Sequence, residues 1–295
     1  MIKVIASDMD GTLLGDDHKV APETLEAVKA AQASGIRFMI ATGRNFPGAM
    51  TELEGLDLTC DYIVGSGAEV RNPEKEVVQT TAISYEVCRQ VYDTVSKYPI
   101  SVIFCTDDLD YRIGTKEEVE ESIIRQIQLF HLDNFREEVE STELYKHIKE
   151  RTRFIQDFSV VEEQKLPIYK IFLFAGDLEM LDKIKRELEL NKEIAVASSF
   201  ITNLEITDVK AQKGPVVKKY IESLGYKMEE VMVFGDSLND LSMLSMDFGA
   251  TVAMENGDQK VKEAAKYVTK SNTEFGVAYT IYELLKKQGN IVESL

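Results

Sequence analysis

The feature that most constrains the fold is an alternation of short apolar runs with helical patterns at both ends of the chain. Residues 2–7 are a short β-branched run, and residues 36–44 are interpreted as a second buried strand. Between them, residues 22–35 have Pro22 at an expected first helical turn and Gly35 as an expected C-cap. The order strand, helix, strand is typical of parallel strands joined by crossover helices. It predicts an α/β fold built on a doubly wound parallel, Rossmann-like sheet.

The last third of the chain repeats this alternation, with apolar strands expected at residues 231–236 and 250–254 and a helix after each. The middle of the chain differs, because two alternating runs that suggest a hairpin are followed by charged helical stretches and further strands. We therefore expect a core domain formed by residues 1–82 and 208–295, and an inserted α+β domain at residues 83–207.

Composition and charge limit the partners that the protein can have. The 295 residues carry a formal net charge of −17 and give a pI near 4.7, so nucleic acid and anionic membranes are not expected partners. The three cysteines lack the spacing of a metal or redox motif, which favours free thiols over disulfides. The N-terminus has no signal-peptide pattern, and no run is long enough to span a membrane. A soluble, cytoplasmic protein is expected, with no indication of its oligomeric state.

Two segments place paired aspartates at the ends of expected strands. Asp8 and Asp10 follow the first run in "SDMDG", and Asp236 and Asp240 follow a later run in "GDSLND". If the two strands are neighbours in the sheet, their carboxyl ends open into one crevice, which is where α/β proteins bind ligands. Carboxylates this close raise one another's pKa unless a cation lies nearby. Hard oxygen ligands suit Mg²⁺, so the sequence predicts a magnesium site at this edge.

Two further segments supply groups that bind anions. "ATGR" ends the second strand with Thr42 and Gly43, a hydroxyl and an exposed amide that could hold phosphate oxygens. "AQKGP" places Lys213 at the start of a helix, where its ammonium and the helix amides could converge on the same anion. Each segment alone is a weak signal. Their order along the chain, taken together with the aspartates, indicates a phosphate site.

These motifs resemble those of the haloacid dehalogenase-like (HAD) superfamily of phosphohydrolases, because "DMDGTLL", "ATGR", "QKG" and "GDSLND" follow one another in the family's order. The resemblance extends over the whole chain. Within the superfamily the chain looks like the Cof-type branch, whose members carry a C2B-type cap domain between the second and third motifs. The insertion at residues 83–207 matches that cap in position and size. One departure is Ser66, which stands where the family usually has an asparagine after the third strand.

The resemblance implies a role for each motif residue. Asp8 is the nucleophile that forms an aspartyl-phosphate, and Asp10 is the general acid and base. Mg²⁺ is bound by Asp8, by the backbone carbonyl of Asp10 and by Asp236. The phosphoryl oxygens and their surroundings are held by the remaining motif residues, with Thr42, Gly43, Lys213 and Asn239 on the phosphate and Asp240 orienting the lysine or the metal's water.

The implied activity is that of a Mg²⁺-dependent phosphatase for small soluble phosphate monoesters, such as a sugar phosphate. A phosphotransferase or mutase with the same intermediate is the nearest alternative, because the motifs do not show whether water or a second hydroxyl accepts the phosphoryl group. A regulatory protein phosphorylated on aspartate is a further alternative. Receiver domains of that kind are much shorter and lack an inserted domain, which favours an enzyme.

Three residues near the motifs have less defined roles. Arg44 and Asn45 follow the second motif, and they could reach the leaving group of a substrate or serve in packing. His18 follows the first strand and is interpreted as an exposed turn residue rather than a substrate contact.

Overall fold

The computed structural model describes residues 1–131 and 136–289. None of the helices in this described part is long and apolar enough to cross a membrane. Its cysteines are free thiols, as the sequence predicts: Cys60 and Cys88 are buried and Cys105 is half-buried.

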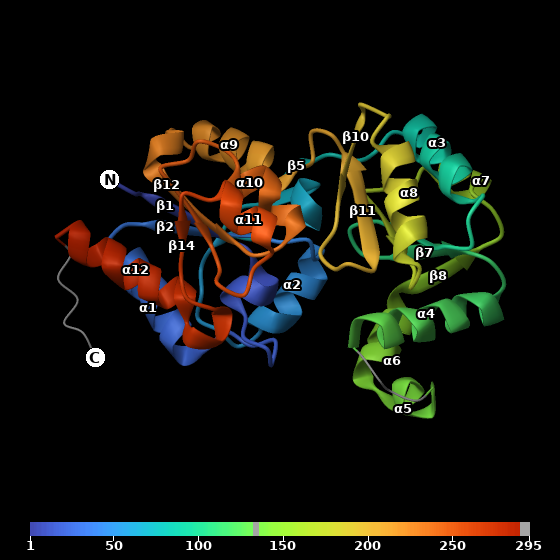
Figure 1. The fold of residues 1–295 in the computed structure, drawn as a ribbon, viewed down its shortest axis with the longest axis horizontal. Coiled ribbons are helices and arrows are strands. Elements are labelled where there is room, and N and C mark those ends of the chain that lie inside the picture. Colours follow the sequence, from blue (N-terminus) through green and yellow to red (C-terminus); the bar gives the residue numbers. More distant parts are fainter. Residues whose placement is uncertain (132–135, 290–295) are drawn as a thin grey trace. The chain divides into compact units, whose positions relative to one another are not determined.

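The chain divides into two compact units, one formed by residues 1–80 and 211–295 and the other by residues 81–210. Figure 1 shows this division by colour, since the blue and red ends of the chain share the first unit and the green and yellow segments form the second. The sequence predicts an inserted domain at residues 83–207. Strand β11 (Asn203–Asp208) of the second unit continues one residue past that range, so the chain leaves the unit only after this strand.

An eight-stranded sheet lies at the centre of the first unit, in the strand order β14-β13-β12-β1-β2-β3-β4-β5. Its strands are β1 (Val4–Ser7), β2 (Arg37–Ala41), β3 (Asp61–Val64), β4 (Glu69–Arg71), β5 (Val77–Thr80), β12 (Val231–Gly235), β13 (Ala250–Ala253) and β14 (Tyr267–Val268). The strands from β14 to β3 run parallel, which confirms the predicted doubly wound sheet. β1 and β12 are neighbours, with Val4 opposite Val231 and Ser7 opposite Phe234.

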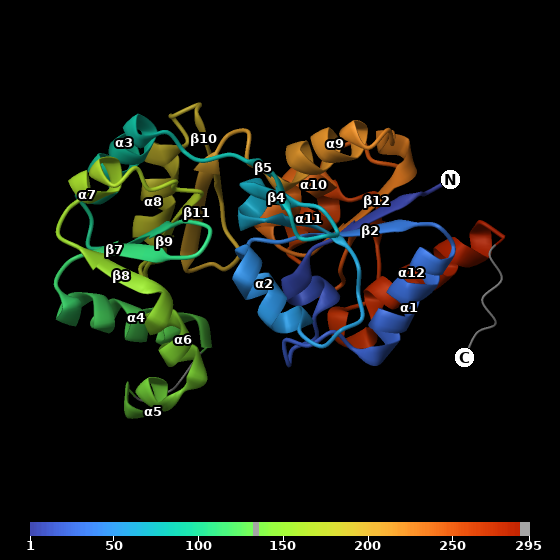
Figure 2. The same cartoon turned by 180° about the vertical axis from the view of Figure 1, so that it is seen from behind.

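Helices cover both faces of this sheet, as Figures 1 and 2 show. They are α1 (Pro22–Ala33), α2 (Phe46–Leu53), α9 (Lys213–Ser223), α10 (Leu241–Leu244), α11 (Gln259–Ala264) and α12 (Gly276–Lys287). One face packs Ile5 and Phe234 against α1 and α12, and the other packs Val4 and Val233 against α9 and α10. Since alternate residues of a strand point to opposite faces, β1 and β12 are apolar apart from Ser7 because both of their sides are buried.

One expected strand is wrong. The run "DYIVGSGAEV" predicts a single third strand, whereas β3 ends at Val64 and the chain reverses into the antiparallel strand β4. The reversal is a tight turn in which Gly65, Ser66 and Gly67 have φ of +59°, +58° and +105°. Glycine adopts such left-handed conformations at little cost. A Cβ at Gly67 would also lie 3.0 Å from the backbone carbon of Gln212, so this turn packs directly before α9.

The second unit contains a six-stranded sheet in the order β10-β11-β9-β6-β7-β8. Besides β11, its strands are β6 (Ser101–Cys105), β7 (Asp110–Ile113), β8 (Thr152–Ile155), β9 (Lys170–Phe174) and β10 (Ile194–Ala197). The predicted hairpin is confirmed, because β6 and β7 pair antiparallel. Strand β8 was not expected from the sequence. Only Ile155 of its four residues is buried, so the strand carries no alternating or continuous apolar pattern.

Two groups of helices lie on opposite sides of the second sheet (Figure 1). One group is α3 (Tyr85–Val95), α7 (Ser159–Glu163) and α8 (Leu178–Leu188), which share a buried core with the sheet. The other group is α4 (Lys116–His131), α5 (Arg136–Ser141) and α6 (Glu143–Arg151), which bury a small core of their own. The second unit is therefore α+β, as expected.

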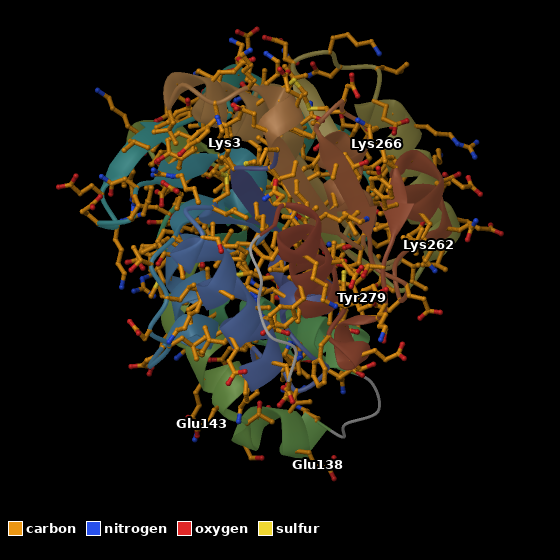
Figure 3. All side chains as sticks on the ribbon, turned by 90° about the vertical axis from the view of Figure 1, so that its left-hand side faces the viewer. Lys3, Glu138, Glu143, Lys262, Lys266 and Tyr279 are labelled. Carbon is orange, nitrogen blue, oxygen red and sulfur yellow. The ribbon has the colours of Figure 1, made fainter. Side chains whose placement is uncertain are left out.

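Charged side chains cover the surface of both units, among them the labelled Lys3, Lys266 and Glu143 in Figure 3. Lys3 pairs with Glu230 at 2.5 Å and Lys266 with Asp247 at 2.6 Å. Exposed pairs of this kind contribute little to stability, because water and salt screen them. The stability of each unit therefore depends on its apolar core, and an ion pair matters only where it is buried.

Candidate active site

The ends of β1 and β12 bring three carboxylates together. Asp8 follows Ser7 at the end of β1, and Asp236 follows Gly235 at the end of β12. Because these parallel strands are paired in register, their carboxyl ends lie side by side. Asp8, Asp236 and Asp240 each offer an oxygen, and these oxygens lie within 4.8 Å of one another. The predicted meeting of the two aspartate motifs is confirmed for these residues.

Lys213 lies at the centre of this cluster. It is the first residue of α9 and its side chain is fully buried. The ammonium donates hydrogen bonds to Oδ1 of Asp8 at 2.7 Å and to Oδ1 of Asp240 at 2.6 Å. Burial alone would lower the pKa of Lys213, but the charges of Asp240 and Asp8 outweigh it and raise the pKa. The site therefore holds a permanently charged ammonium between two carboxylates.

Gly214 determines how closely this lysine approaches the cluster. A Cβ at this position would lie 2.0 Å from the backbone oxygen of Ser242 in α10. Glycine thus lets the first turn of α9 contact α10 directly, which places the adjacent Lys213 at the strand ends. The "KG" pair in the sequence is explained by this contact, since the second residue permits the position of the first.

Asp240 is held by contacts that use both of its carboxylate oxygens. It ends a helical turn at Leu238–Asp240 and is completely buried. Oδ2 accepts hydrogen bonds from the backbone amides of Asp236 at 3.0 Å and Ser237 at 3.1 Å, while Oδ1 binds Lys213. Asp240 therefore orients the lysine and the loop after β12.

Asp236 is half-buried and is fixed by a residue that the sequence analysis missed. Oδ1 of Asp236 accepts a hydrogen bond of 2.8 Å from Oγ1 of Thr12. The loop after β1 approaches so closely that a Cβ at Gly11 would lie 2.5 Å from Oδ2 of Asp236, and Gly11 has a φ of +73°. The adjacent "GT" after Asp10 is the signal that could have indicated Thr12.

Asp10 lies outside the group of three carboxylates. Its carboxylate binds Arg44, with Nε to Oδ2 at 2.8 Å and Nη2 to Oδ1 at 2.7 Å. Nδ1 of the exposed His18 is 3.7 Å from Oδ1 of Asp10. Burial would raise the pKa of Asp10, but the hydrogen bonds and charge of Arg44 outweigh this effect and lower the pKa. We expected Asp8 and Asp10 to face the later aspartates together. Asp8 does so, whereas the carboxylate of Asp10 binds Arg44 instead.

The second motif forms the neighbouring part of the same edge. Thr42 follows β2, which is paired with β1, and it is buried. Its amide donates to the carbonyl of Ile63 at 2.8 Å, its carbonyl accepts from the amide of Ser66 at 2.9 Å, and its Oγ1 accepts from the amide of Arg44 at 3.1 Å. Three hydrogen bonds thus hold Thr42 beside the end of β1, and Gly43 follows it directly.

Asn239, the remaining candidate, lies in the helical turn before Asp240. Its Oδ1 accepts a hydrogen bond of 3.3 Å from Oγ of Ser237. The structure therefore places Asn239 on the loop that carries Asp236 and Asp240.

The electrostatics of the cluster fit a divalent cation. Burial and the charges of Asp240 and Asp236 raise the pKa of Asp8 well above its usual range, although Lys213 opposes them. Burial and Asp240 raise the pKa of Asp236 to about 7. One lysine thus leaves the carboxylates incompletely neutralised. A donor set made of carboxylate oxygens suits a hard cation such as Mg²⁺, so the cluster has the ligand type and the charge that a metal site needs.

We expect the metal-free protein to lose stability as the pH rises from about 4 to about 7. In this interval the folded protein keeps a proton on Asp236, whose pKa is about 7 against an ordinary 3.8, so the folded state binds more protons than the unfolded state. Urea unfolding in EDTA should give a lower free energy at about pH 8 than at about pH 5. Asp236→Asn should flatten this dependence, and Mg²⁺ should stabilise the wild type most at the higher pH. A wild-type free energy of unfolding that does not fall between these two pH values, or that falls equally in Asp236→Asn, would contradict the prediction.

Comparisons with known proteins agree with this geometry. A family model described as haloacid dehalogenase-like hydrolase matches residues 5–281. The chain is similar to the 5-amino-6-(5-phospho-D-ribitylamino)uracil phosphatase YwtE of Bacillus subtilis, with 30% identity over 294 residues that cover 97% of this chain and 99% of that protein. It is also similar to the pyridoxal phosphate phosphatase YbhA of Escherichia coli, with 27% identity and coverage of 96% and 98%. A solved haloacid dehalogenase-like hydrolase from B. subtilis has a TM-score of 0.82 at 27% identity, covering 96% of this chain and 100% of that one.

Proposed function

Since the chain belongs to the haloacid dehalogenase-like hydrolase family, we propose that it is a Mg²⁺-dependent phosphatase for small soluble phosphate monoesters. The observation that carries the proposal is the buried Lys213, which bridges Asp8 and Asp240 at the strand ends beside Asp236. Phosphoryl transfer needs little protein chemistry besides a positioned nucleophile and charge stabilisation. This cluster contains both.

Asp8 is the proposed nucleophile. Lys213 occupies its Oδ1, and among the hydrogen bonds of the described residues none engages Oδ2, so Oδ2 is the oxygen that attacks. In the first step an Oδ2–P bond forms, the bond from phosphorus to the ester oxygen breaks, and Asp10 gives a proton to that oxygen. In the second step water attacks the aspartyl-phosphate, Asp10 takes a proton from it, and phosphate leaves with Asp8 restored.

The phosphoryl oxygens are held by groups fixed on three elements. We assign this role to the ammonium of Lys213, the hydroxyl of Thr42, the amide of Gly43 and the side chain of Asn239. Asp240 acts on the phosphate through Lys213, whose ammonium it binds. These groups stabilise the negative charge that spreads over the equatorial oxygens in the transition state.

The proposed Mg²⁺ ligands are Asp8, the backbone carbonyl of Asp10 and Asp236, and Asp240 orients the ion's surroundings. When bound, the ion neutralises charge on the transferring phosphoryl group. Thr12 keeps Asp236 in place through its hydrogen bond. The raised pKa of Asp236 and of Asp8 supports this assignment, because each reflects negative charge that the protein alone leaves uncompensated.

We further propose that the unit at residues 81–210 is the C2B-type cap and selects the substrate. The relatives YwtE and YbhA are named for small phosphate esters, a phosphoribitylaminouracil and pyridoxal phosphate. These names support metabolite-sized phosphates as the substrate class. The cytoplasmic location expected from the sequence stays a prediction.

The test is phosphate release from a panel of sugar phosphates, nucleotides and cofactor phosphates, with Mg²⁺ and with EDTA. Release from some members of the panel that depends on Mg²⁺ is the expected result, and the ranking of substrates would identify the physiological class. Product analysis with an added second alcohol would distinguish hydrolysis from transfer. If no member released phosphate under either condition, the hydrolase proposal would lose its support.

A further inference from the structure

We propose that Asn256 is a positioning residue that holds the loop after β1 and the loop after β12 at the spacing that binding of a divalent cation requires. The inference rests on the proposed function, in which the first loop supplies Asp8 and the backbone carbonyl of Asp10 to Mg²⁺ and the second supplies Asp236. Asn256 lies in the loop after β13 and belongs to no motif of the sequence analysis.

The two loops need such a link because both carry negative charge. Lys213 compensates the charge of Asp8 through a hydrogen bond of 2.7 Å. The carboxylate of Asp236 is held by the neutral hydroxyl of Thr12, which lies 2.8 Å from its Oδ1. Like charges on neighbouring loops repel one another, and this repulsion is strongest before a cation is bound. Hydrogen bonds between neutral groups of the backbone and side chains can keep the loops together without adding charge.

The loop after β13 is bound first to the loop after β12. The two strands pair in parallel, so the chain leaves both of them at the same edge of the sheet. The amide of Asp258 donates to the carbonyl of Asp236 at 2.7 Å. Gly257 lies so close that a Cβ there would be 2.8 Å from the same carbonyl oxygen. The backbone of Asp236 is therefore fixed to the segment that carries Asn256.

The side chain of Asn256 then reaches the loop after β1. Its Nδ2 donates a hydrogen bond of 2.8 Å to the carbonyl of Gly11, the residue directly after Asp10. Its Oδ1 accepts a hydrogen bond of 2.9 Å from the backbone amide of Asn272. Because a carbonyl can only accept and a backbone amide can only donate, these partners fix which end of the side-chain amide faces each of them. Asn256 thus ties Gly11 to the segment that binds Asp236.

A link of this kind should affect metal binding more than folding or chemistry. Asn256 is exposed, so its replacement by alanine opens no cavity in the core. The substitution leaves the proposed ligands and the bond between Thr12 and Asp236 in place. Without the link, the cation itself has to hold the loop after β1 in position, and this ordering reduces its affinity. Once the cation is bound, the site has the same groups as before.

The test measures the Kd of Mg²⁺ alone for the full-length protein by isothermal titration calorimetry, in the wild type and in Asn256→Ala. We expect the Kd to rise about tenfold, at the lower end of what the loss of an outer-shell support costs a metal site. The Mg²⁺ concentration that gives half-maximal phosphate release should rise in parallel. The kcat at saturating Mg²⁺ should stay near that of the wild type.

Asn72→Ala is the matched control. Asn72 also uses both ends of its side-chain amide, since Nδ2 donates to Oε2 of Glu76 at 3.0 Å and Oδ1 accepts from the amide of Glu76 at 2.8 Å. These bonds lie in the turn between β4 and β5 at the edge of the sheet, so the same substitution there should leave the Kd of Mg²⁺ unchanged. Asn256→Ser, whose side chain is too short to bridge the loops, should raise the Kd as Asn256→Ala does, and it replaces that variant if the alanine protein folds poorly.

A Kd in Asn256→Ala equal to that of the wild type would overturn the inference, even if the free energy of unfolding fell, because Asn256 would then serve the fold alone. A kcat at saturating Mg²⁺ that falls as far as the affinity would also overturn it, since the substitution would have damaged the site rather than loosened its loops. Failure of the proposed function looks different, because then the wild type itself would bind no Mg²⁺ and release no phosphate.

Discussion

Asp8→Asn is expected to lower Mg²⁺-dependent phosphate release by about 10³-fold or more, as is typical when an enzyme loses its nucleophile. The carboxamide that replaces the carboxylate is a poor nucleophile and cannot form the aspartyl-phosphate. The fold should survive, because the substitution preserves the shape of the side chain. It also removes a buried carboxylate, and burial and Asp240 already raise the pKa of this group. Phosphate release on the best substrate of the panel, together with a thermal unfolding curve, checks both statements.

Asp57→Asn is the matched control for this experiment. Asp57 has a side chain that is 97% exposed and pairs with Lys29 at 3.2 Å, so the same chemical change there should leave the activity as it is. Release that persists in Asp8→Asn at the wild-type rate would mean that the reaction takes place at another site or comes from a contaminant. A folded Asp8→Asn protein without activity would place Asp8 in the catalytic site, as the proposed nucleophile and Mg²⁺ ligand.

Lys213→Met is expected to abolish activity and to destabilise the metal-free protein by about 3–5 kcal/mol, the usual effect of removing one partner of a buried ion pair. Lys213, Asp8 and Asp240 are all buried, so the variant leaves two carboxylates without their cation. They can respond only by taking up protons. The loss in the free energy of unfolding should therefore be larger at about pH 8 than at about pH 6, as urea unfolding in EDTA would measure.

A second substitution separates electrostatics from packing in this result. If the uncompensated charge causes the loss, adding Asp8→Asn to Lys213→Met should recover part of the stability, because one of the two orphaned carboxylates is then neutral. If the double variant is less stable than Lys213→Met, the lost packing of the lysine chain is the larger effect and the electrostatic explanation is wrong.

Much of the first unit could be predicted from the sequence because its determinants are local. The β-branched run at residues 2–7 and Pro22 at the start of α1 each reflect a preference of a few neighbouring residues. The position of β12 beside β1 followed from one topological rule for doubly wound sheets. The strands of the second unit were harder to predict from the sequence, since β8 is an edge strand with little buried surface.

Contacts between distant parts of the chain are the features that the sequence did not show. Lys213 is 205 positions from Asp8, and Thr12 is 224 positions from Asp236. The family motif indicated Lys213, whereas Thr12, although it lies in the quoted first motif, received no role until its bond to Asp236 was seen. The sequence left Arg44 equally open to a role at the leaving group and to packing, and the structure shows it bound to Asp10 and Glu52.

The sequence by itself determined the alternation of strands and helices, the insertion between two halves of a sheet, and the residue types that can transfer a phosphoryl group. These follow from patterns in which each residue depends on its near neighbours. Only the tertiary structure decided the turn at residues 65–67, the direction of the Asp10 carboxylate and the partners of Arg44. Each of these depends on a side chain or backbone group that packing brings in from elsewhere in the chain, so no local pattern encodes it.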